Sequence, residues 1–575
     1  MTGQRFDLVV VGGGVAGMTA ALVGAIQGLR VVLLEKSLQL GGTSATSAGT
    51  AWIPGTSRAA ECGHADSIEA AYTYLQSFTG DNSAQINTLQ RTFLETGDEA
   101  VRYLASHSEV QLEPAAHHPD YRGDAPGAVE SGRALVTPDF DGRKLRSDDF
   151  SLVKPPRPEM MILGGMMIAK EDIQPLLDAF RKPSGFIYAA KLLFRYLSDR
   201  LFYSRGTRLV LGNAMVARLL FSLRQRGVEI RTGVAVRELL TEGRKVVGVR
   251  CITGGNLIDI PAASGVVLAT GGFAGSPAWR RRFLEVGAQV RGLVDGGCAG
   301  DGIELALAVG GALGESHAGA GFYMPMSTLR TPAGTTKTFP HIYLDRAKPG
   351  LLAVNSEAER FVNEADSYHD FVLGMLKANR SVPTIPAYLI CDSAFLKDYG
   401  LGLVRPRSWS VGYYIRSGYL KCADTIEGLA HQIGVPAEKF SDTVRRYNDF
   451  AAIGIDADFG RGRSPLNRHN GDPRNTPNPC LRPICRPPFY AVAVEPAALA
   501  TSLGLSTDRD ARVLDPSGTV VEGLYACGND MNSIMAGHYP GPGVTLGPAI
   551  VFAYRAARHA SEVFGCAKLE SLHLL

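Results

Sequence analysis

The chain has 575 residues, too many for a single hydrophobic core, and its length predicts roughly two to four domains. Its 59 basic and 56 acidic residues leave a formal charge of +3, which gives no electrostatic case for nucleic acid binding. The nine cysteines are odd in number and scattered, so we expect reduced thiols and no metal centre. An apolar strand begins at Phe6 and no run of about 18 apolar residues occurs, so we expect neither a signal peptide nor a membrane-spanning helix and place the protein in the cytoplasm.

The N-terminal segment has the pattern of a dinucleotide-binding unit. An apolar strand, Phe6–Val11, leads into the glycine-rich segment Gly12–Gly17, a helix expected over Met18–Gln27 and a second strand that ends at Glu35. In such a unit, glycines permit a tight turn, the approach of backbone N–H groups to a pyrophosphate and close packing of helix on sheet, here Gly12, Gly14 and Gly17. The acid at the end of the second strand can accept hydrogen bonds from both ribose hydroxyls, so the pattern predicts a bound dinucleotide.

Small side chains dominate the next segment, Gly41–Gly55, which is too poor in bulky residues to build a core of its own. Such a segment suits a backbone that passes close to a flat cofactor. Three strands are expected further along the chain, at Val228–Arg231, Val246–Ile252 and Gly265–Phe273, and the last is a buried strand stopped by glycines.

The C-terminal region repeats the combination of strand, glycine turn and helix. A short strand is expected at Gly523–Gly528, a glycine-rich turn at Gly537–Gly547, and a helix from Pro548 to about Val563. Glycine turns suited to contact a cofactor therefore occur at both ends of the chain. The simplest topology is a nucleotide-binding domain that its own C-terminal segment completes.

This topology predicts an α/β fold, with a Rossmann-like nucleotide-binding domain made of residues 1–290 and 496–575. An α+β domain, residues 291–495, is expected as an insertion that caps the site and carries part of the catalytic machinery. Within the first piece, Lys182–Arg208 mixes aromatic and aliphatic residues with basic ones, which is the composition of an interfacial amphipathic helix. A helix packed on the protein's own core or on a dimer partner would show the same pattern, so peripheral membrane contact is one of two hypotheses for this segment.

Several motifs resemble known flavoproteins. VVVGGGVAG at Val9, VVLATGGFAG at Val266, the GDG at Gly300 and LYACGN at Leu524 resemble the superfamily of fumarate reductase and succinate dehydrogenase flavoprotein subunits, over nearly the whole chain. Within this superfamily, three motifs resemble the 3-ketosteroid Δ1-dehydrogenases: HPDYRGDAPG, RFVNEADSYHDF and GHYPGPGVTLG. The resemblance implies an FAD-binding domain of the type completed by a C-terminal segment.

The resemblance also implies the cofactor and its contacts. Succinate dehydrogenases attach their flavin to a histidine that the segment Leu38–Thr50 lacks, so we expect FAD to be bound non-covalently. The expected cofactor-binding residues lie in the glycine turns, the small-residue segment and the motifs just quoted: Gly12, Gly14, Val15, Ala16, Gly17, Glu35, Lys36, Gly42, Thr43, Ser44, Ser47, Ala48, Gly49, Ala269, Thr270, Gly271, Asp301, Gly528, Asn529, Gly543 and Leu546.

By the same resemblance, the catalytic residues are Tyr121, Tyr368, Tyr539 and Gly543, and the enzyme is an FAD-dependent oxidoreductase of steroid catabolism. It would remove a proton from C2 of a 3-ketosteroid and a hydride from C1 to flavin N5. The C2 proton becomes acidic only when donors polarise the carbonyl, which the Tyr539 hydroxyl and the Gly543 N–H could do. We expect Tyr368 to be the base and Tyr121 its proton outlet, although a tyrosine of pKa about 10 is a poor base unless a neighbour lowers that value.

Alternatives remain open at this stage. His369 and His538 adjoin the proposed catalytic tyrosines and could be rival bases. The substrate pocket should be apolar, and Phe322, Tyr323 and Met324 could form its walls.

Other activities use related chemistry. A 3-ketosteroid Δ4-(5α)-dehydrogenase needs the same flavin with a base over a different carbon, and a fumarate-reductase-like flavoprotein would act on another enone or enoate. A non-catalytic electron carrier is a third alternative. We expect electrons to pass to a quinone or another acceptor, with possible contact on the inner face of the cytoplasmic membrane through residues 182–208. The sequence specifies neither the steroid side chain nor the oligomeric state.

Overall fold

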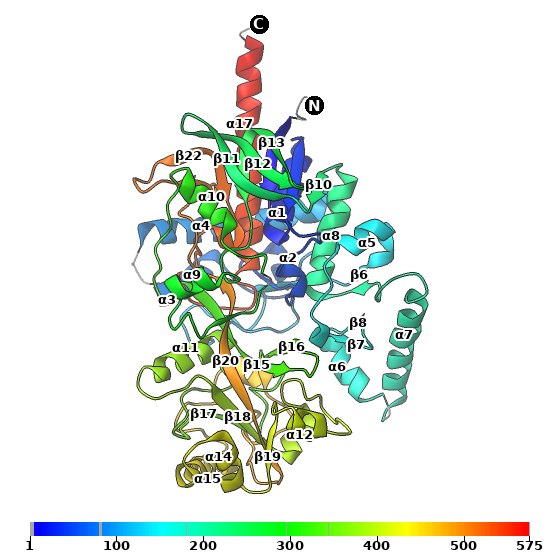
Figure 1. Ribbon diagram of the computed structural model, residues 1–575, viewed down its shortest axis with the longest axis vertical. Coiled ribbons are helices and arrows are strands. Elements are labelled where there is room, and N and C mark those ends of the chain that lie inside the picture. Colours follow the sequence, from blue (N-terminus) through cyan, green and yellow to red (C-terminus); the bar gives the residue numbers. More distant parts are fainter. Residues whose placement is uncertain (1–4, 80–82, 180, 295, 343, 574–575) are drawn as a thin grey trace.

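The computed structural model describes residues 5–573 except 80–82, 180, 295 and 343 (Figure 1). Two β-sheets lie one beyond the other along the long axis of the molecule, and helices cover the sheet that carries the N-terminal strand. The chain begins and ends at the same end of the molecule (Figure 1). The predicted class, an α/β Rossmann-like domain with an inserted α+β domain, is confirmed.

The upper sheet contains the parallel core that the glycine-rich N-terminus predicts. β1 pairs in parallel with β2 and β13, and β22 joins the far side of β13 from near the other end of the chain. Within the described residues this sheet has eight strands: β10 (Glu229–Thr232), β2 (Val31–Glu35), β1 (Phe6–Val11), β13 (Asn256–Leu268), β12 (Lys245–Thr253), β11 (Ala235–Glu242), β22 (Val520–Ala526) and β21 (Arg512–Leu514). The C-terminal segment therefore completes this domain, as predicted.

Three helices bury the core of this domain. α1 (Val15–Ile26) packs against α17 (Leu546–His573) and α8 (Leu211–Gln225). α1 begins three residues before its predicted start, directly after the glycine turn, and its first ten residues are all buried. Because it is apolar on every side, it lies between the sheet and the other helices rather than at the surface.

The lower sheet is centred on a long strand, β20 (Phe489–Thr501), which pairs with β15 along one edge and β18 along the other. Among the described residues this sheet has seven strands, whose other members are β16 (Thr336–Pro340), β15 (Gly321–Arg330), β18 (Ala387–Asp392), β17 (Leu351–Val354), β14 (Arg291–Gly292) and β19 (Lys421–Ala423). The predicted domain boundary between 495 and 496 falls inside β20. Because β20 is paired with neighbouring strands along both of its edges, a domain boundary cannot divide it. We therefore propose that the inserted domain extends to the end of β20.

The other elements complete the two domains. Up to residue 308 they are β3 (Ala51–Trp52), α2 (Ser57–Glu61), α3 (Ile68–Thr79), α4 (Ala84–His107), β4 (Glu113–Pro114), β5 (Ala134–Val136), β6 (Phe140–Asp141), α5 (Ser147–Leu152), β7 (Met161–Ile162), β8 (Met166–Met167), α6 (Lys170–Leu177), α7 (Pro183–Asp199), β9 (Arg208–Leu209), α9 (Pro277–Phe283) and α10 (Asp301–Ala308). The inserted domain adds α11 (Tyr368–Asn379), α12 (Ser393–Tyr399), α13 (Gly412–Arg416), α14 (Ile426–Ile433), α15 (Ala437–Ile453) and α16 (Pro465–Asn470).

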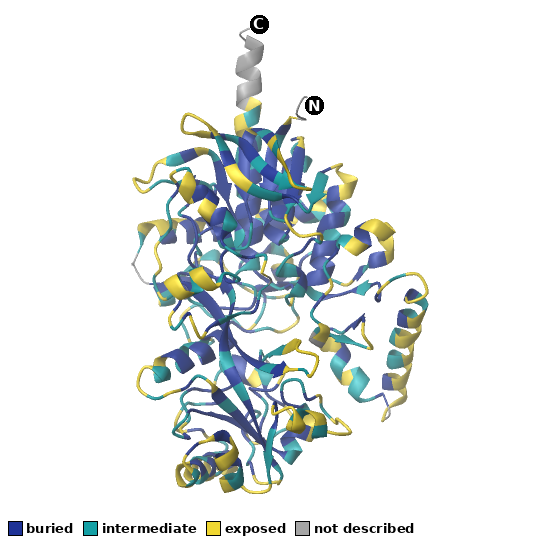
Figure 2. Cartoon of the chain, in the orientation of Figure 1, coloured by how far each residue is buried: buried dark blue, intermediate teal, exposed yellow. Residues whose placement is uncertain are grey.

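The segment 182–208 is helical over only part of its length. α7 ends at Asp199, whose carboxylate accepts hydrogen bonds from the backbone N–H and the hydroxyl of Thr207, both at 2.8 Å, so the chain folds back into β9. Tyr196 is buried, but most of the large apolar side chains do not pack on the protein's own core: those that are exposed include Phe186, Ile187, Leu193, Phe194, Leu197, Leu201 and Phe202. Figure 2 shows this exposed surface along α7, on the flank of the molecule.

The described part of the chain contains no helix that is long and apolar enough to cross a membrane. Eight cysteines are free thiols there, and Cys566 lies outside the described side chains. Within the same limits, no group of three or more His, Cys, Asp or Glu side chains is arranged to hold a metal ion.

Candidate active site

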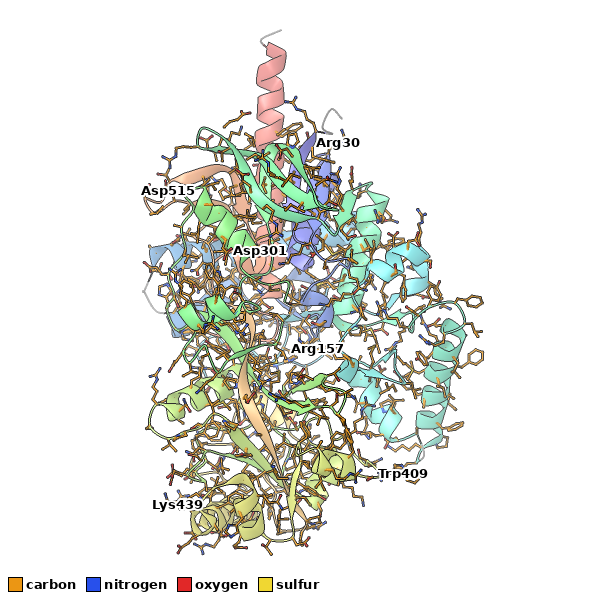
Figure 3. All side chains as sticks on the ribbon, in the orientation of Figure 1. Arg30, Arg157, Asp301, Trp409, Lys439 and Asp515 are labelled. Carbon is orange, nitrogen blue, oxygen red and sulfur yellow. The ribbon has the colours of Figure 1, made fainter. Side chains whose placement is uncertain are left out.

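A cavity of about 1680 Å³ opens between the two sheets, and the glycine turns from both ends of the chain line it. Arg157 and Asp301, which Figure 3 labels in the middle and upper parts of the molecule, belong to its wall. The lower part of the cavity is lined by β15, β16 and loops of the inserted domain. One continuous space therefore extends from the nucleotide-binding turns to the region between the domains.

All the residues predicted to contact the cofactor line this cavity except Gly17. Glu35 ends β2 inside it, and its carboxylate accepts hydrogen bonds from the N–H groups of Gly13, at 2.7 Å, and Ser37, at 2.8 Å. This carboxylate retains further lone pairs, which can accept the hydrogen bonds predicted from the ribose hydroxyls. The assignment of these residues to FAD stays a prediction.

Two glycines of the N-terminal turn are required by space. Gly12 has a φ of +112°, and a Cβ there would lie 2.2 Å from the carbonyl oxygen of Ala269. A Cβ at Gly17 would lie 1.9 Å from the carbonyl oxygen of Gly12. The turn, the helix and the neighbouring strand therefore pack so closely that only glycine fits at both positions, which leaves the start of α1 facing the cavity.

Sequence reasoning missed a buried acid behind this wall. Asp530 accepts hydrogen bonds from the backbone N–H groups of Thr270 and Gly272 and from the Thr270 hydroxyl. Burial raises the pKa of Asp530, and these three donors offset part of that effect. Its position directly after Gly528-Asn529 in the quoted motif was the signal that could have found it. Asp301 lies at the start of α10 and forms an ion pair with Lys36, which fits the cofactor-contact role predicted for it.

Three tyrosines from distant parts of the chain meet in the cavity wall. The ring centroids of Tyr368 and Tyr539 are 5.2 Å apart, those of Tyr121 and Tyr539 5.9 Å, and those of Tyr121 and Tyr368 5.8 Å. The hydroxyl oxygens of Tyr121 and Tyr368 are 3.5 Å apart. An ion pair between Arg122 and Asp370, at 3.0 Å, joins the loop of Tyr121 to α11, which begins at Tyr368.

The loop that carries Tyr539 is held by backbone contacts. The carbonyl oxygen of Pro540 accepts hydrogen bonds from the Tyr121 N–H, at 2.8 Å, and from the Tyr74 hydroxyl, at 2.6 Å. Asp120 links this region to a buried network, since it accepts from Arg133 at 2.8 Å. The loop is therefore fixed against the segment of Tyr121 before any ligand binds.

Gly543 also has no room for a side chain. Its φ is +91°, and a Cβ would lie 2.2 Å from the carbonyl oxygen of Thr50. Its own carbonyl accepts the N–H of Trp52 at 3.1 Å, whereas its N–H has no acceptor within the described part of the chain. Because Gly543 lines the cavity, this N–H is available to a ligand oxygen.

Burial sets the protonation of the tyrosines. It raises the pKa of Tyr539 to about 12, so this hydroxyl remains a hydrogen-bond donor at any working pH. Burial raises the pKa of Tyr368 well above 10, and the neighbouring hydroxyl groups of Tyr121 and Tyr539 raise it further. A tyrosine base at neutral pH needs a neighbour that lowers its pKa, and the neighbours of Tyr368 raise it instead.

The rival base His369 is occupied by the backbone. Its Nδ1 accepts the N–H of Tyr323 at 3.2 Å, and its Nε2 donates to the carbonyl oxygen of Gly537 at 3.1 Å. Burial lowers the pKa of His369 to about 4, so the ring is neutral and holds the Tyr539 loop in place. Burial also lowers the pKa of His538, whose ring lies against Phe78 outside the cavity wall.

Of the three residues expected to form the walls of the substrate pocket, only Met324 lines the cavity. Phe322 instead packs edge-on against Tyr539, with ring centroids 5.3 Å apart, and Tyr323 stacks on His369. Alternation along β15 turns Tyr323 to the opposite face from Met324, because successive side chains of a strand point to opposite faces. The pairing of β15 with β20 is irregular between Phe322 and Tyr323, so this alternation does not extend to Phe322.

Residues 7–546 match the family described as the FAD binding domain. The glycine turns, the Glu35 carboxylate and the size of the cavity fit this cofactor. The chain therefore belongs to this family of flavoproteins, binds FAD and is an FAD-dependent oxidoreductase.

Two related proteins and one solved structure show which flavoproteins the chain resembles. The chain is 34% identical over 578 residues to the 3-oxosteroid 1-dehydrogenase of Mycolicibacterium smegmatis, covering 97% of each. It is 35% identical over 562 residues to the 4-oxocyclohex-2-ene-1-carboxylate 5-dehydrogenase of Sinomonas cyclohexanicum, covering 97% of this chain and 94% of that one. The crystal structure of a 3-ketosteroid Δ1-dehydrogenase from Sterolibacterium denitrificans, in complex with 1,4-androstadiene-3,17-dione, superposes with a TM-score of 0.89 at 33% identity, covering 97% of this chain and 100% of that one. The chain is a member of the family that contains the 3-oxosteroid 1-dehydrogenases.

Proposed function

We propose that this flavoenzyme introduces the C1–C2 double bond into a 3-ketosteroid. The observation that carries the proposal is the meeting of Tyr121, Tyr368 and Tyr539 beside the unpaired N–H of Gly543, in a cavity that continues to the nucleotide-binding turns. The relatives at 32 to 34% identity that are named 3-oxosteroid 1-dehydrogenases support it.

The substrate carbonyl is held by two donors. The Tyr539 hydroxyl and the Gly543 N–H hydrogen-bond its oxygen, and they stabilise the negative charge that develops there as the neighbouring C–H bond breaks. Both donors are fixed by packing and backbone contacts, so they need no rearrangement when that charge appears. FAD supplies the acceptor for the hydride from C1.

Tyr368 accepts the proton from C2 in this proposal. Its high pKa makes the neutral phenol the resting form, so proton removal requires the ionised fraction or the transfer of its own proton to Tyr121 as the C2 proton arrives. Arg346 lies close enough for its charge to favour negative charge on Tyr121. Tyr121 is therefore suited to pass the proton onward.

The test is anaerobic mixing of the yellow protein with androst-4-ene-3,17-dione, followed by identification of the product. Bleaching of the flavin with a 1,4-diene product supports the proposal. Bleaching only by a 5α-saturated ketosteroid, with a 4-ene product, would favour a Δ4-(5α)-dehydrogenase instead. Smaller cyclic ketones, such as the keto acid that the Sinomonas relative is named for, need the same carbonyl clamp and belong in the same assay.

We also propose peripheral contact with the inner face of the cytoplasmic membrane, and transfer of electrons to a quinone or another acceptor. The exposed apolar residues of α7 and its following turn support this contact, since Phe194 and Phe202 are 77% and 81% exposed. When mixed with anionic vesicles and centrifuged, the wild type should sediment and the Phe194→Asp/Phe202→Asp variant should remain in the supernatant. The control is Leu257→Asp, which alters an apolar residue of the β12–β13 hairpin that is 64% exposed, and this variant should sediment like the wild type. Wild type that stays wholly in the supernatant would refute the proposal.

A further inference from the structure

One wall of the cavity carries a cluster of amine and imidazole groups that the proposed reaction does not use. The nitrogen cluster, as we call it, consists of His118, Lys170, Lys348 and His469. The ring of His118 lies 5.1 Å from that of His469, and Lys170 Nζ lies 3.0 Å from His469 Nε2. Lys348 Nζ donates to the carbonyl oxygen of Gly471 at 2.8 Å, two residues beyond His469. His118, Lys170 and Lys348 all line the cavity.

The charge of this wall comes from its lysines. Burial lowers the pKa of His118 to about 4 and that of His469 to about 3, so both rings are neutral at neutral pH. Burial also lowers the pKa of Lys170 and of Lys348. The negative charge of Glu171 offsets part of this effect for Lys170, and that of Asp472 does so for Lys348.

The carboxylate of Asp472 is already engaged by other side chains. Asp472 accepts two hydrogen bonds from Arg474, at 2.9 and 2.8 Å, and one from the Tyr399 hydroxyl at 2.7 Å. The negative charge of Asp472 is therefore balanced by Arg474 and does not neutralise Lys348 by itself.

A second observation indicates a polar ligand at this wall. The Nδ1 atom of His118 is enclosed and has no hydrogen-bond partner in the described part of the chain. Enclosed polar atoms are usually paired, because leaving one unpaired costs about 1–3 kcal/mol. A ligand atom in the cavity can supply the missing partner, because His118 faces that space.

We propose that the nitrogen cluster binds a carboxylate of the substrate, so that the enzyme acts on a ring ketone that also carries an acid group. The inference rests on the proposed function for the ketone end of the molecule. Tyr121 lies close to both ends: its ring centroid is 5.9 Å from that of Tyr539 and 6.4 Å from that of His118. A carboxylate is the group that ammonium donors bind with charge-assisted hydrogen bonds, which the mostly apolar cavity strengthens.

The shared chemistry, a keto acid, has two sources, and the test has an arm for each. The first arm uses 4-oxocyclohexane-1-carboxylate and its methyl ester, in which the acid lies on the ring of the ketone. The second uses 3-oxochol-4-en-24-oate and its methyl ester, in which the acid lies at the end of a steroid side chain. Binding to the oxidised holoenzyme is measured from the change in the flavin absorption spectrum, and turnover is measured separately.

We expect the acid to bind about tenfold or more tightly than its ester in at least one arm. Lys348→Gln and Lys170→Gln should each reduce this preference severalfold and leave the affinity for the ester unchanged. The control is Lys182→Gln, because Lys182 lines the same cavity but is paired with Asp178 at 3.1 Å. This control should keep the full preference for the acid.

Equal binding of acid and ester by the wild type in both arms would overturn the inference, as would a preference that survives both cluster substitutions. A preference for the acid without any bleaching of the flavin by a ketone would support the carboxylate site and contradict the proposed function. Bleaching by androst-4-ene-3,17-dione without a preference for either acid would do the reverse.

Discussion

Replacing Tyr539 with phenylalanine removes one of the two donors proposed for the substrate carbonyl. The ring is buried against Tyr121, Tyr368 and Phe322, and phenylalanine keeps those contacts, so the fold should be unaffected. The hydroxyl that is lost has a pKa of about 12 and is therefore a donor in every enzyme molecule at neutral pH. Its removal deletes an interaction with charge that develops only as the reaction proceeds.

Loss of one such donor costs on the order of 100-fold to 1000-fold in rate, about 2.7–4 kcal/mol. We expect flavin reduction by androst-4-ene-3,17-dione, followed anaerobically by stopped-flow absorbance, to slow by this factor. The Gly543 N–H remains and accounts for the residual rate.

The matched control is Tyr323→Phe, which also removes one buried phenol hydroxyl. Tyr323 stacks on His369 and does not line the cavity, so its substitution should leave the rate of flavin reduction within about threefold of the wild type. If Tyr539→Phe reduced its flavin as fast as this control, the carbonyl clamp would be wrong.

Three further predictions concern other parts of the site. Because the raised pKa of Tyr368 leaves little phenolate at neutral pH, the rate of flavin reduction should rise nearly tenfold per pH unit between about pH 6 and 9, and a plateau below pH 8 would assign the proton to another base. Gly543→Ala forces a Cβ to 2.2 Å from the Thr50 carbonyl at a φ of +91°, so it should cost about 1–2 kcal/mol in denaturant unfolding and at least about 100-fold in rate, and a variant that retained both would contradict the close approach. Asp530→Asn should lower the ratio of flavin to protein after purification, since an amide cannot accept from all the donors of Thr270 and Gly272, and undiminished flavin content would show that this carboxylate does not support the cofactor wall.

Contiguous patterns predicted the framework of the cofactor site. The strand, turn and strand from Phe6 to Glu35 are read from neighbouring residues. The contact that leaves no room for a side chain at Gly12 is with the distant carbonyl of Ala269, and only the structure shows it. The end of α7 was not predictable in this way, because the hydrogen bonds between Asp199 and Thr207 that end it depend on how the chain returns.

The composition of the site depends on contacts between distant segments. Periodicity could not have predicted that the three tyrosines meet. They were predicted together only because their motifs resemble those of a known family. The nitrogen cluster was missed for the same physical reason: His118, Lys170, Lys348 and His469 are unremarkable in their own segments and become a cluster only when the inserted domain closes on the nucleotide domain.

The central claim is that the protein removes two hydrogens from adjacent carbons of a cyclic ketone. One equivalent of androst-4-ene-3,17-dione is added to the anaerobic holoenzyme, and the product is identified by mass and by its ultraviolet absorption. The account predicts a bleached flavin and androsta-1,4-diene-3,17-dione in equal amounts. A flavin that stays oxidised with this steroid, with cholest-4-en-3-one, with a 5α-saturated ketosteroid and with both keto acids would contradict it.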